Sequence, residues 1–583
     1  MNTTLKALPI AVLISVMYGC GGGVQNSPGS TAPQSGASAP QGSASSTPAT
    51  SASASNYTPG NLLVSRTAYD PANVVSGTLP YNATPTTTNA SPVTAVTPGT
   101  YPNVFTNDAN DGNFGITSEA YLDQWTPGAG SPSQTLDITA QAAKNQVKFA
   151  TSFASKSELA LNVSLDQKSL SFVGYNTTID QLDISNSNTP GVVDTTNTDI
   201  AAPTYRTVGQ LTFASNSLSF TNTNAYAGNN GRAAVLANGM FYIVGNAGNS
   251  GKNPKPTTAL LDMLTMNTGV QSIAPGSSCA FSQVIGAFQS GTGTGTYAAA
   301  PAGTACSLAA MGSITGGSST GDQFGFTIAT LPTTPATVAD KTGKDENLRG
   351  LFVGPDGTMY VSKGSGGNGV NTVYQVGATG ALANGGVLPQ NAPVTILPGF
   401  PTALATNLTN LTSPAQVTGT VYPFGMWIPS SNPSIMFVTD EGDGVAGDQV
   451  SGSGGLWVYQ KQNGVWKPLT NLTTGLTLGT AYTVTDSTGV YGTKGASYTT
   501  TPDGLRNIAG QVNSDGSFTI YAVTSTIANS LGTAFDAGAD SNQLVKITVT
   551  VNGSTVTSAS GFSVMQTAPY GQALRGVAIV PNS

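Results

Sequence analysis

The sequence predicts an all-β fold, specifically a β-propeller of six blades. Beyond residue 60, no stretch keeps a helical period of apolar residues, and short alternating runs separated by Gly, Asn and Asp turns recur instead. A unit of strand, turn, strand, loop and strand repeats along the chain. Charged residues make up only 8% of the 583 residues, against about 25% in a typical soluble domain. Gly, Thr, Ser and Asn, which suit turns and strand surfaces, take their place.

The clearest repeat unit is NLRGLFVGPDGTMYVSKGSGGNGVNTVYQV at 347–376, with an Asp-Gly turn between its first two strands. Similar units predict inner strands that start near residues 158, 232, 349, 424, 506 and 575. The last is a half-unit, LRGVAIV, and the segments NLLVSRTAY and AYLDQW near the other end of the body can complete its sheet. Pairing of the N- and C-terminal strands would close the ring and leave no open sheet edge.

The predicted propeller occupies residues 61–583, with an insertion at about 275–345. This insertion lies in the widest gap between units and leaves room for a seventh blade. A β-sandwich array and a β-helix are the alternative folds that the same strand pattern allows.

Residues 1–19 have the pattern of a signal peptide, with Lys6 followed by an apolar stretch too short to cross a bilayer. Gly19-Cys20 resembles the lipobox of bacterial lipoproteins, although Met17 and Tyr18 depart from the usual pattern. The resemblance implies that Cys20 carries a lipid, and an ordinary secretory peptide with a chance cysteine is the alternative.

Residues 20–60 follow as a Ser/Ala/Pro/Thr tether with almost nothing to bury. Because Gly21 stands after the lipobox cysteine, the resemblance also implies sorting to the outer membrane. We therefore expect an exported protein, either an outer-membrane lipoprotein or one otherwise secreted or held at the cell surface.

The repeat units also resemble the blades of NHL-type propellers. Several segments are similar to a group of uncharacterised secreted bacterial propeller proteins, namely SKSELALNVS, SNSNTPGVVD, GNNGRAA, VSKGSGGNGVNTVYQVG and DGLRNIAG. This resemblance implies the fold and the export, and it implies no particular activity.

Four of the six arginines occupy one place in the repeat, the start of an inner strand: Arg232, Arg349, Arg506 and Arg575. Glu158 stands at this place in another unit. Inner strands line the central channel of a propeller, so we expect these side chains to converge at one mouth. Either each guanidinium binds carbonyls of a neighbouring loop, or the mouth binds an anionic ligand such as a carboxylate or phosphate.

An acidic loop follows the second strand of its unit and contains Asp440, Glu441 and Asp443 among glycines. Clustered carboxylate oxygens are the ligands that calcium takes, so these three residues form a candidate calcium site. Ordinary Asp-Gly turn chemistry is the alternative. Calcium is the one cofactor that the sequence suggests, and the predicted fold requires none.

Two further cysteines, Cys279 and Cys306, lie within the insertion. In an exported protein such a pair predicts a disulfide, because the compartment is oxidising. Two free thiols are the alternative.

The chain contains no histidine, which excludes Ser-His-Asp catalysis and every His-ligated metal site. The net charge of −7 is thinly spread, and no basic stripe predicts a nucleic-acid partner. We expect a monomeric binding or interaction module of the cell envelope that captures an unknown protein, glycan or small anion through one face. The alternatives are a calcium-dependent lactonase-like hydrolase, as some six-bladed propellers are, and a structural envelope protein.

Replacing Cys20→Ser tests the predicted anchor. We expect the variant to leave the membrane fraction, because a protein without its acyl chains loses the burial of those chains in the bilayer. Cell fractionation with immunoblotting measures this, and an unchanged membrane fraction would show that Cys20 does not anchor the chain.

Overall fold

The structure is a computed structural model. The chain divides into residues 1–53, which lie outside the described part, and residues 54–583. The structure describes residues 57–70, 116–181, 204–226, 230–246, 269–280, 347–364, 370–402, 421–442, 453–527 and 538–582, short pieces within 78–104 and 282–330, and residue 444.

Each sheet of four or more strands is one propeller blade, and the first three blades are given from the innermost strand outward. Blade 1 contains β34 (Gln572–Ile579), β1 (Leu62–Ala68), β4 (Thr117–Trp125) and β5 (Gln134–Asp137), with β6 (Thr151–Ser152) paired to β4. Blade 2 contains β7 (Asn162–Val163), β8 (Ser169–Tyr175), β9 (Arg206–Thr212) and β10 (Ser217–Thr223). Blade 3 contains β11 (Asn230–Ala237), β12 (Met240–Asn246), β13 (Gly269–Ile273) and β14 (Gln283–Ile285).

The other three blades follow the same order. Blade 4 contains β20 (Leu351–Val353), β21 (Met359–Lys363), β22 (Thr372–Val376) and β23 (Val394–Ile396), with β19 (Ala329–Thr330) parallel to β23. Blade 5 contains β24 (Pro423–Trp427), β25 (Ile435–Asp440), β26 (Gly455–Gln462) and β27 (Val465–Leu472). Blade 6 contains β29 (Ser497–Val512), β30 (Phe518–Ile527), β31 (Gln543–Asn552) and β32 (Thr555–Ala559), with β28 (Tyr482–Thr485) on β29 and β33 (Ser563–Thr567) on β31.

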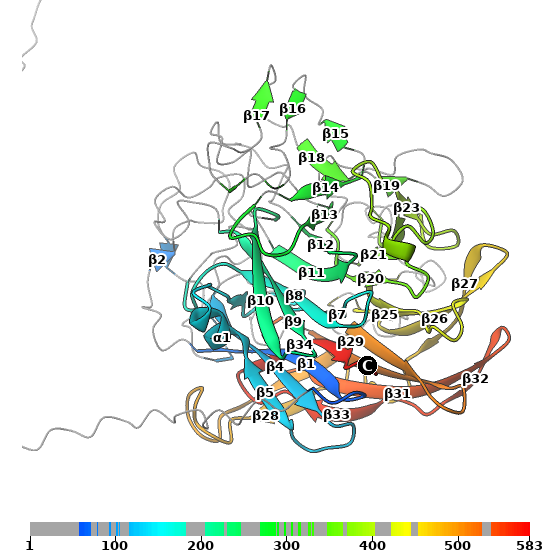
Figure 1. Ribbon diagram of the computed structural model, residues 1–583. Helices are drawn as coiled ribbons and strands as arrows, with labels where there is room; N and C mark the ends of the chain where they lie inside the picture. The colour runs from blue at the N-terminus through cyan, green and yellow to red at the C-terminus, as the bar shows by residue number, and fades with distance from the viewer. Residues whose placement is uncertain are drawn as a thin grey trace, which may run out of the picture. The chain divides into compact units, whose positions relative to one another are not determined.

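The innermost strands form a closed ring. Each contacts the innermost strand of the next blade, in the order β34, β7, β11, β20, β24, β29 and back to β34. This arrangement confirms the predicted all-β fold as a six-bladed propeller (Figure 1).

The two ends of the described body close the ring in blade 1. Strand β1 pairs antiparallel with β34, so that Leu63 lies opposite Ala578, and it pairs with β4 on its other side. The side chains of β1 alternate, as strand geometry requires. Leu62 and Val64 pack toward blade 6, whereas Leu63 joins a core cluster with residues of blade 2. The predicted closure by N- and C-terminal strands is therefore confirmed (Figure 1).

Neighbouring blades pack through large apolar side chains. Trp427 of blade 5 contacts Phe437 in its own blade and Phe518 of blade 6. Its ring lies against Gly510 of blade 6, where a Cβ atom would come within 2.4 Å of the indole. A glycine is therefore needed at this point, because any side chain would push the two blades apart.

Within the predicted insertion, β14 and β19 join blades 3 and 4, and other described pieces form two short ladders outside the blades. These are β15 (Phe288–Ser290) with β18 (Phe324–Thr327), and β16 (Thr296–Ala298) with β17 (Ser313–Thr315). Elsewhere β2 (Thr78–Leu79) pairs with β3 (Val93–Thr94), α1 (Ile138–Lys144) follows β5, and a 3-10 turn, η3, spans Ala383–Gly385. Among the residues described, no helix is both long and apolar enough to cross a membrane.

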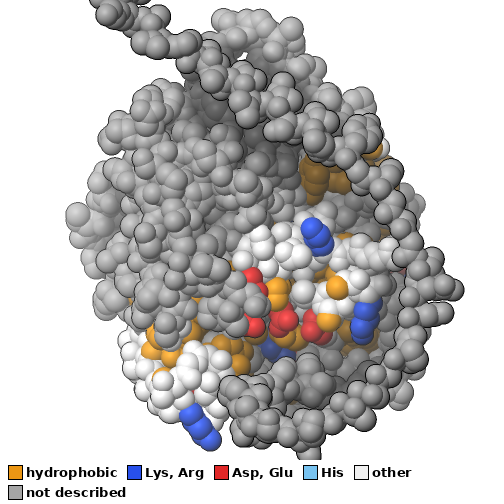
Figure 2. Space-filling view, turned by 90° about the vertical axis from the view of Figure 1, so that its left-hand side faces the viewer, with side chains coloured by type: hydrophobic (Ala, Val, Ile, Leu, Met, Phe, Trp, Pro, Cys, Tyr) orange, Lys and Arg blue, Asp and Glu red, His pale blue; other side chains and the backbone are white. Residues whose placement is uncertain are grey.

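Much of the face drawn in Figure 2 belongs to residues outside the described part of the chain. Among the described side chains on this face, Asp and Glu side chains gather near the middle, and Lys and Arg side chains lie around them.

Candidate functional site

One mouth of the propeller channel is crossed by a loop of blade 2. This segment, Phe153–Glu158, connects β6 to the residues before β7, and we call it the plug loop. Five of its six residues are buried, and Lys156 is partly exposed. Residues of all five other blades contact the plug loop, as the following bonds and contacts show.

Two of the predicted arginines bind the plug loop directly. Arg575, in β34 of blade 1, donates from Nη2 to the Phe153 carbonyl. Arg349, just before β20 of blade 4, donates from Nη1 to Ser157 Oγ over 2.5 Å. Both guanidiniums are buried, so these bonds lie away from solvent. The planar fork of arginine suits this task, because it can join separate chain segments.

A buried carboxylate ties the plug loop to two more blades. Glu441, directly after β25 of blade 5, lies with Oε2 3.1 Å from Lys156 Nζ of the plug loop. The same oxygen lies 3.6 Å from Nε of Arg506 in blade 6. The Glu441 and Arg506 side chains are only 2% and 5% exposed, so their attraction is weakly screened. Loss of the carboxylate would leave two cations facing each other at a buried place.

The remaining contacts complete the circle around the plug loop. Asn230 of blade 3 donates from Nδ2 to Ser155 Oγ over 3.1 Å. Gly538, before β31 of blade 6, lies so close to the Ala154 carbonyl that a Cβ atom would approach it to 1.9 Å. The plug loop therefore fills the channel mouth at which we expected the arginines to converge.

Arg232, the fourth predicted arginine, binds outside the plug loop. Its Nη1 donates to Asn347 Oδ1 and, over 2.8 Å, to the Leu348 carbonyl, which both precede β20. Arg232 thus joins blade 3 to blade 4. Of the two interpretations that the sequence left open, these contacts favour the one in which arginines tie neighbouring loops together.

Glu158 lies at this mouth with partners that the sequence did not indicate. Its carboxylate accepts bonds from Tyr175 OH at 2.5 Å, Thr151 Oγ1 at 2.7 Å and the Ser152 amide at 2.9 Å. Burial raises the pKa of Glu158, and these bonds and the charge of Arg206 oppose the rise. Its carboxylate therefore belongs to a network of blades 1 and 2.

Arg206 is the member of this network that sequence analysis missed. Its guanidinium lies over the Tyr175 ring, 4.2 Å from the ring centre, and Nη1 donates to the Thr204 carbonyl over 2.5 Å. It lies in β9, the third strand of blade 2, whereas the repeat pattern directed attention to the innermost strands. Its pairing with Tyr175 of β8 is a cross-strand relation that a strand alignment could have revealed.

The predicted calcium ligands have different surroundings. Asp440 accepts bonds from the amides of Tyr422 and Gly442 and from the Trp457 indole, whereas Glu441 faces the two cations described above. Asp443 lies outside the described residues. Among the residues described, no group of three His, Cys, Asp or Glu side chains could hold a metal ion. The calcium site stays a prediction.

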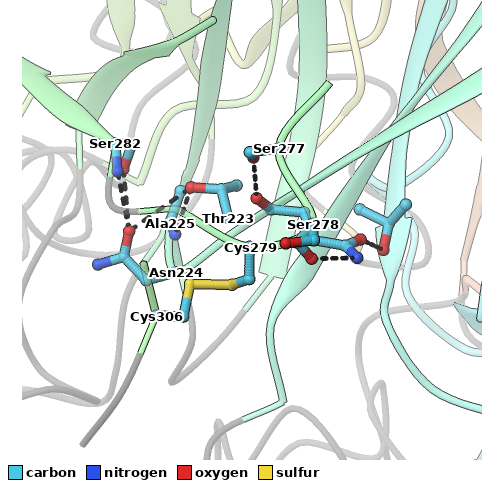
Figure 3. The surroundings of a disulfide bond; sticks show 10 residues. Thr223, Asn224, Ala225, Ser277, Ser278, Cys279, Ser282 and Cys306 are labelled. Atoms are coloured by element: carbon cyan, nitrogen blue, oxygen red, sulfur yellow. Dashed lines mark hydrogen bonds between the residues drawn. A yellow bond between two sulfur atoms is a disulfide. The ribbon is translucent and has the colours of Figure 1, made fainter. Parts of the chain in front are cut away.

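The structure joins Cys279 to Cys306, with their Cα atoms 5.3 Å apart (Figure 3). The surrounding backbone is held by Asn222, whose Nδ2 donates to the Ser278 carbonyl over 2.8 Å, and by Asn224, whose Oδ1 accepts from the Ser282 amide. The disulfide thus connects a turn beside blades 2 and 3 to a later part of the predicted insertion.

The opposite mouth of the channel is an open hollow of about 570 Å³, which we call the funnel. All six innermost strands line it, each through residues that follow its arginine or the equivalent position: Val163, Val235, Phe352, Met426, Ile508 and Val577. In β29, for example, Arg506 reaches the plug-loop mouth and Ile508 lines the funnel.

The funnel combines apolar and amide groups without charge. Phe352, Val353 and Trp427 are partly exposed within it, and Asn162 and Gln511 add amide groups. No Asp, Glu, Lys or Arg belongs to the described residues that line it. Sequence analysis missed the funnel because it weighed only charged positions. The signal was present as apolar residues two or three places after each repeated arginine.

Comparisons with known proteins identify no family. No family model matches the chain, and no curated protein matches it. Among solved structures, the chain is similar to a 6-phosphogluconolactonase-like protein from Bacteroides uniformis. The identity is 7%, the TM-score is 0.31, and the match covers 86% of this chain and 83% of that one. At this TM-score the similarity carries no argument about activity.

Asp440 gives this region a pH dependence. Burial raises its pKa from 3.8 to about 6, although bonds from Gly442, Trp457 and Tyr422 oppose the rise. Because the folded state binds the Asp440 proton more tightly than the unfolded state does, protonation of Asp440 stabilises the folded protein. This stabilisation is fully present below about pH 4 and is lost as the pH rises through 6. Relative to an Asp440→Asn variant, the wild type should lose up to about 3 kcal/mol of unfolding free energy between pH 4 and 7.

Urea denaturation at several pH values measures the free energy of unfolding of both proteins. Asp515→Asn is a control for which the pH dependence should have the opposite sign. Bonds from Ser517 lower the pKa of Asp515, so the wild type should gain stability over this control as the pH rises through 4. Parallel stability curves for wild type and Asp440→Asn would contradict the assignment.

Proposed function

We propose that the protein is a binding module whose ligand enters the funnel. The observation that carries this proposal is a hollow of about 570 Å³ to which all six blades contribute. Ligand sites of proteins are typically concave, measure about 300 to 1,000 Å³ and combine apolar side chains with a few polar groups. The funnel is concave and has a volume in this range, and its lining mixes apolar side chains with polar groups.

The chemistry of the funnel favours an uncharged ligand that has both apolar and hydrogen-bonding groups. Phe352, Val353 and Trp427 offer apolar surface, while Asn162 and Gln511 lie beside them as polar groups. An ion entering the funnel would lose hydration and meet no opposite charge among the described lining residues, which is unfavourable.

This proposal places the binding face at the funnel, whereas the sequence predicted it at the mouth where the arginines converge. The sequence left open whether the arginines tie loops together or bind a small anion; Arg349 and Arg575 donate to the plug loop, and Arg506 lies beside Glu441. A ligand at that mouth would have to displace a buried segment and its bonds. The funnel requires no such displacement.

The lactonase alternative has less support from the geometry. It would need carboxylate and amide groups gathered around an ion in the channel. Glu158 instead binds Tyr175, Thr151 and Ser152, and Asp440 binds two amides and an indole. We therefore give the binding module precedence over an enzyme.

The cellular setting belongs to the same proposal. A lipid on Cys20 and a tether through residue 60 would hold the propeller at the cell envelope while leaving it room to turn. Such a tethered module can capture a ligand close to the surface on which it is anchored.

The test introduces a charge into the funnel and uses Nile red, an uncharged dye that fluoresces in apolar surroundings. Val353→Asp should weaken dye binding about tenfold or more, because the carboxylate would hold water in the hollow. Val387→Asp is the matched control, since Val387 is 55% exposed and lies outside the funnel lining.

Fluorescence titration measures the affinities, and melting curves verify that both variants are folded. A smaller substitution, Phe352→Ala, gives a second measure that adds no charge. Equal binding by all four proteins, or no binding by the wild type, would contradict the proposed role of the funnel.

A further inference from the structure

A second hollow, of about 490 Å³, lies at the junction of blades 6 and 1. One wall is β28 with the residues that follow it as far as Tyr491, in the hairpin that β28 makes with β29. The other wall is the segment Thr567–Gln572, which connects β33 to β34. We call this hollow the tyrosine pocket, because Tyr482, Tyr491 and Tyr570 line it.

We propose that the tyrosine pocket binds an uncharged oligosaccharide. The proposal is independent of the funnel, since the two hollows share no lining residue. It rests on how the loop is built, how the tyrosines are held, and which polar groups line the pocket.

The loop is folded around Asp486. One carboxylate oxygen accepts bonds from the amides of Thr488 and Gly489, at 3.0 and 2.7 Å, and from the Thr488 hydroxyl at 2.9 Å. The other oxygen accepts from the Tyr491 amide at 3.3 Å. The only carboxylate among the described lining residues therefore shapes the loop, and no Lys or Arg belongs to that lining.

Asp486 thereby fixes the position of Tyr491. The Tyr491 ring lies on Gly571, where a Cβ atom would come within 2.4 Å of the ring and where φ is +76°. Its hydroxyl accepts a bond from Gln572 Nε2 at 3.2 Å. Glycine is required at this position for both the close approach and the backbone angle.

The other two tyrosines are also held in place. Tyr482 donates to the Ser541 carbonyl over 2.7 Å, and Tyr570 donates to the Tyr101 carbonyl over 3.0 Å. The Tyr570 ring is buried and packs edge-on against Tyr498, with ring centres 5.6 Å apart, so it supports the wall from within. A ligand would therefore meet Tyr482 and Tyr491, which are partly exposed and already ordered, and this order lowers the entropic cost of binding.

The lining suits the chemistry of a sugar. A pyranose presents apolar C–H faces, which pack on aromatic rings, and hydroxyl groups around its edge, which both donate and accept. Gln543 and Gln572 line the pocket, and an amide side chain offers both donors and an acceptor. Thr483 and Thr485 add exposed hydroxyls at the rim. Because the pocket offers no cation, it favours a neutral sugar over an acidic one.

The test measures binding of maltohexaose, cellohexaose and chitohexaose to the full-length Cys20→Ser protein by isothermal titration calorimetry. We expect at least one of the three to bind and Tyr491→Ala to weaken that binding about tenfold or more. Tyr491→Phe should retain most of the affinity, because the ring that packs on the sugar remains.

A second pair of variants leaves the Tyr491 ring and its packing on Gly571 unchanged. Thr485→Arg should obstruct the rim and weaken binding, whereas Thr557→Arg, at an exposed position of β32 outside the pocket, should leave it unchanged. Val353→Asp should bind the sugar as the wild type does, which separates this site from the funnel. The proposal is overturned if none of the three sugars binds, or if Tyr491→Ala and Thr485→Arg both bind with wild-type affinity.

Discussion

The contact of Glu441 with Lys156 and Arg506 is the interaction on which the closed mouth of this propeller depends. Blades of a propeller otherwise contact only their neighbours around the ring, so little connects opposite sides of the channel. The plug loop supplies that connection because it meets every other blade, and Glu441 neutralises part of the positive charge that gathers there. Arg349 and Arg575 then bind the same loop from two further directions. Three of the four repeated arginines thus help to hold one inserted segment, whereas Arg232 joins blade 3 to blade 4.

This arrangement separates the two ends of the channel. The plug-loop end is filled by the protein's own chain and carries most of its buried charge, whereas the funnel end is open and lined by uncharged groups. The tyrosine pocket lies near the plug loop, because Tyr101 packs against both Tyr570 and Phe153. One buried aromatic cluster thus lies behind the wall of that pocket and beside the plug loop.

The sequence predicted the fold because the information is local and repeated. Inner-strand starts, turn residues and the incomplete last unit are visible in the order of residues, so the six blades and their closure could be predicted. The partners of the arginines could not be predicted, because the plug loop shows no repeat pattern and Ser157 meets Arg349 across 192 positions of the chain. The tyrosine pocket was missed for the same reason: Tyr491 meets Gly571 across 80 positions of the chain. The Glu158 network required knowledge of which strands pair, since Tyr175 and Arg206 lie on the second and third strands of blade 2.

The central claim is that the charged mouth exists to hold the plug loop, and amide hydrogen exchange of residues 153–158 tests it most directly. Glu441→Gln keeps the shape of the side chain and removes the charge that Lys156 and Arg506 share. The account predicts faster exchange throughout the plug loop and a free energy of unfolding lower by about 3 kcal/mol, with unchanged Nile red binding in the funnel. Unchanged exchange in the plug loop, with wild-type stability, would contradict it.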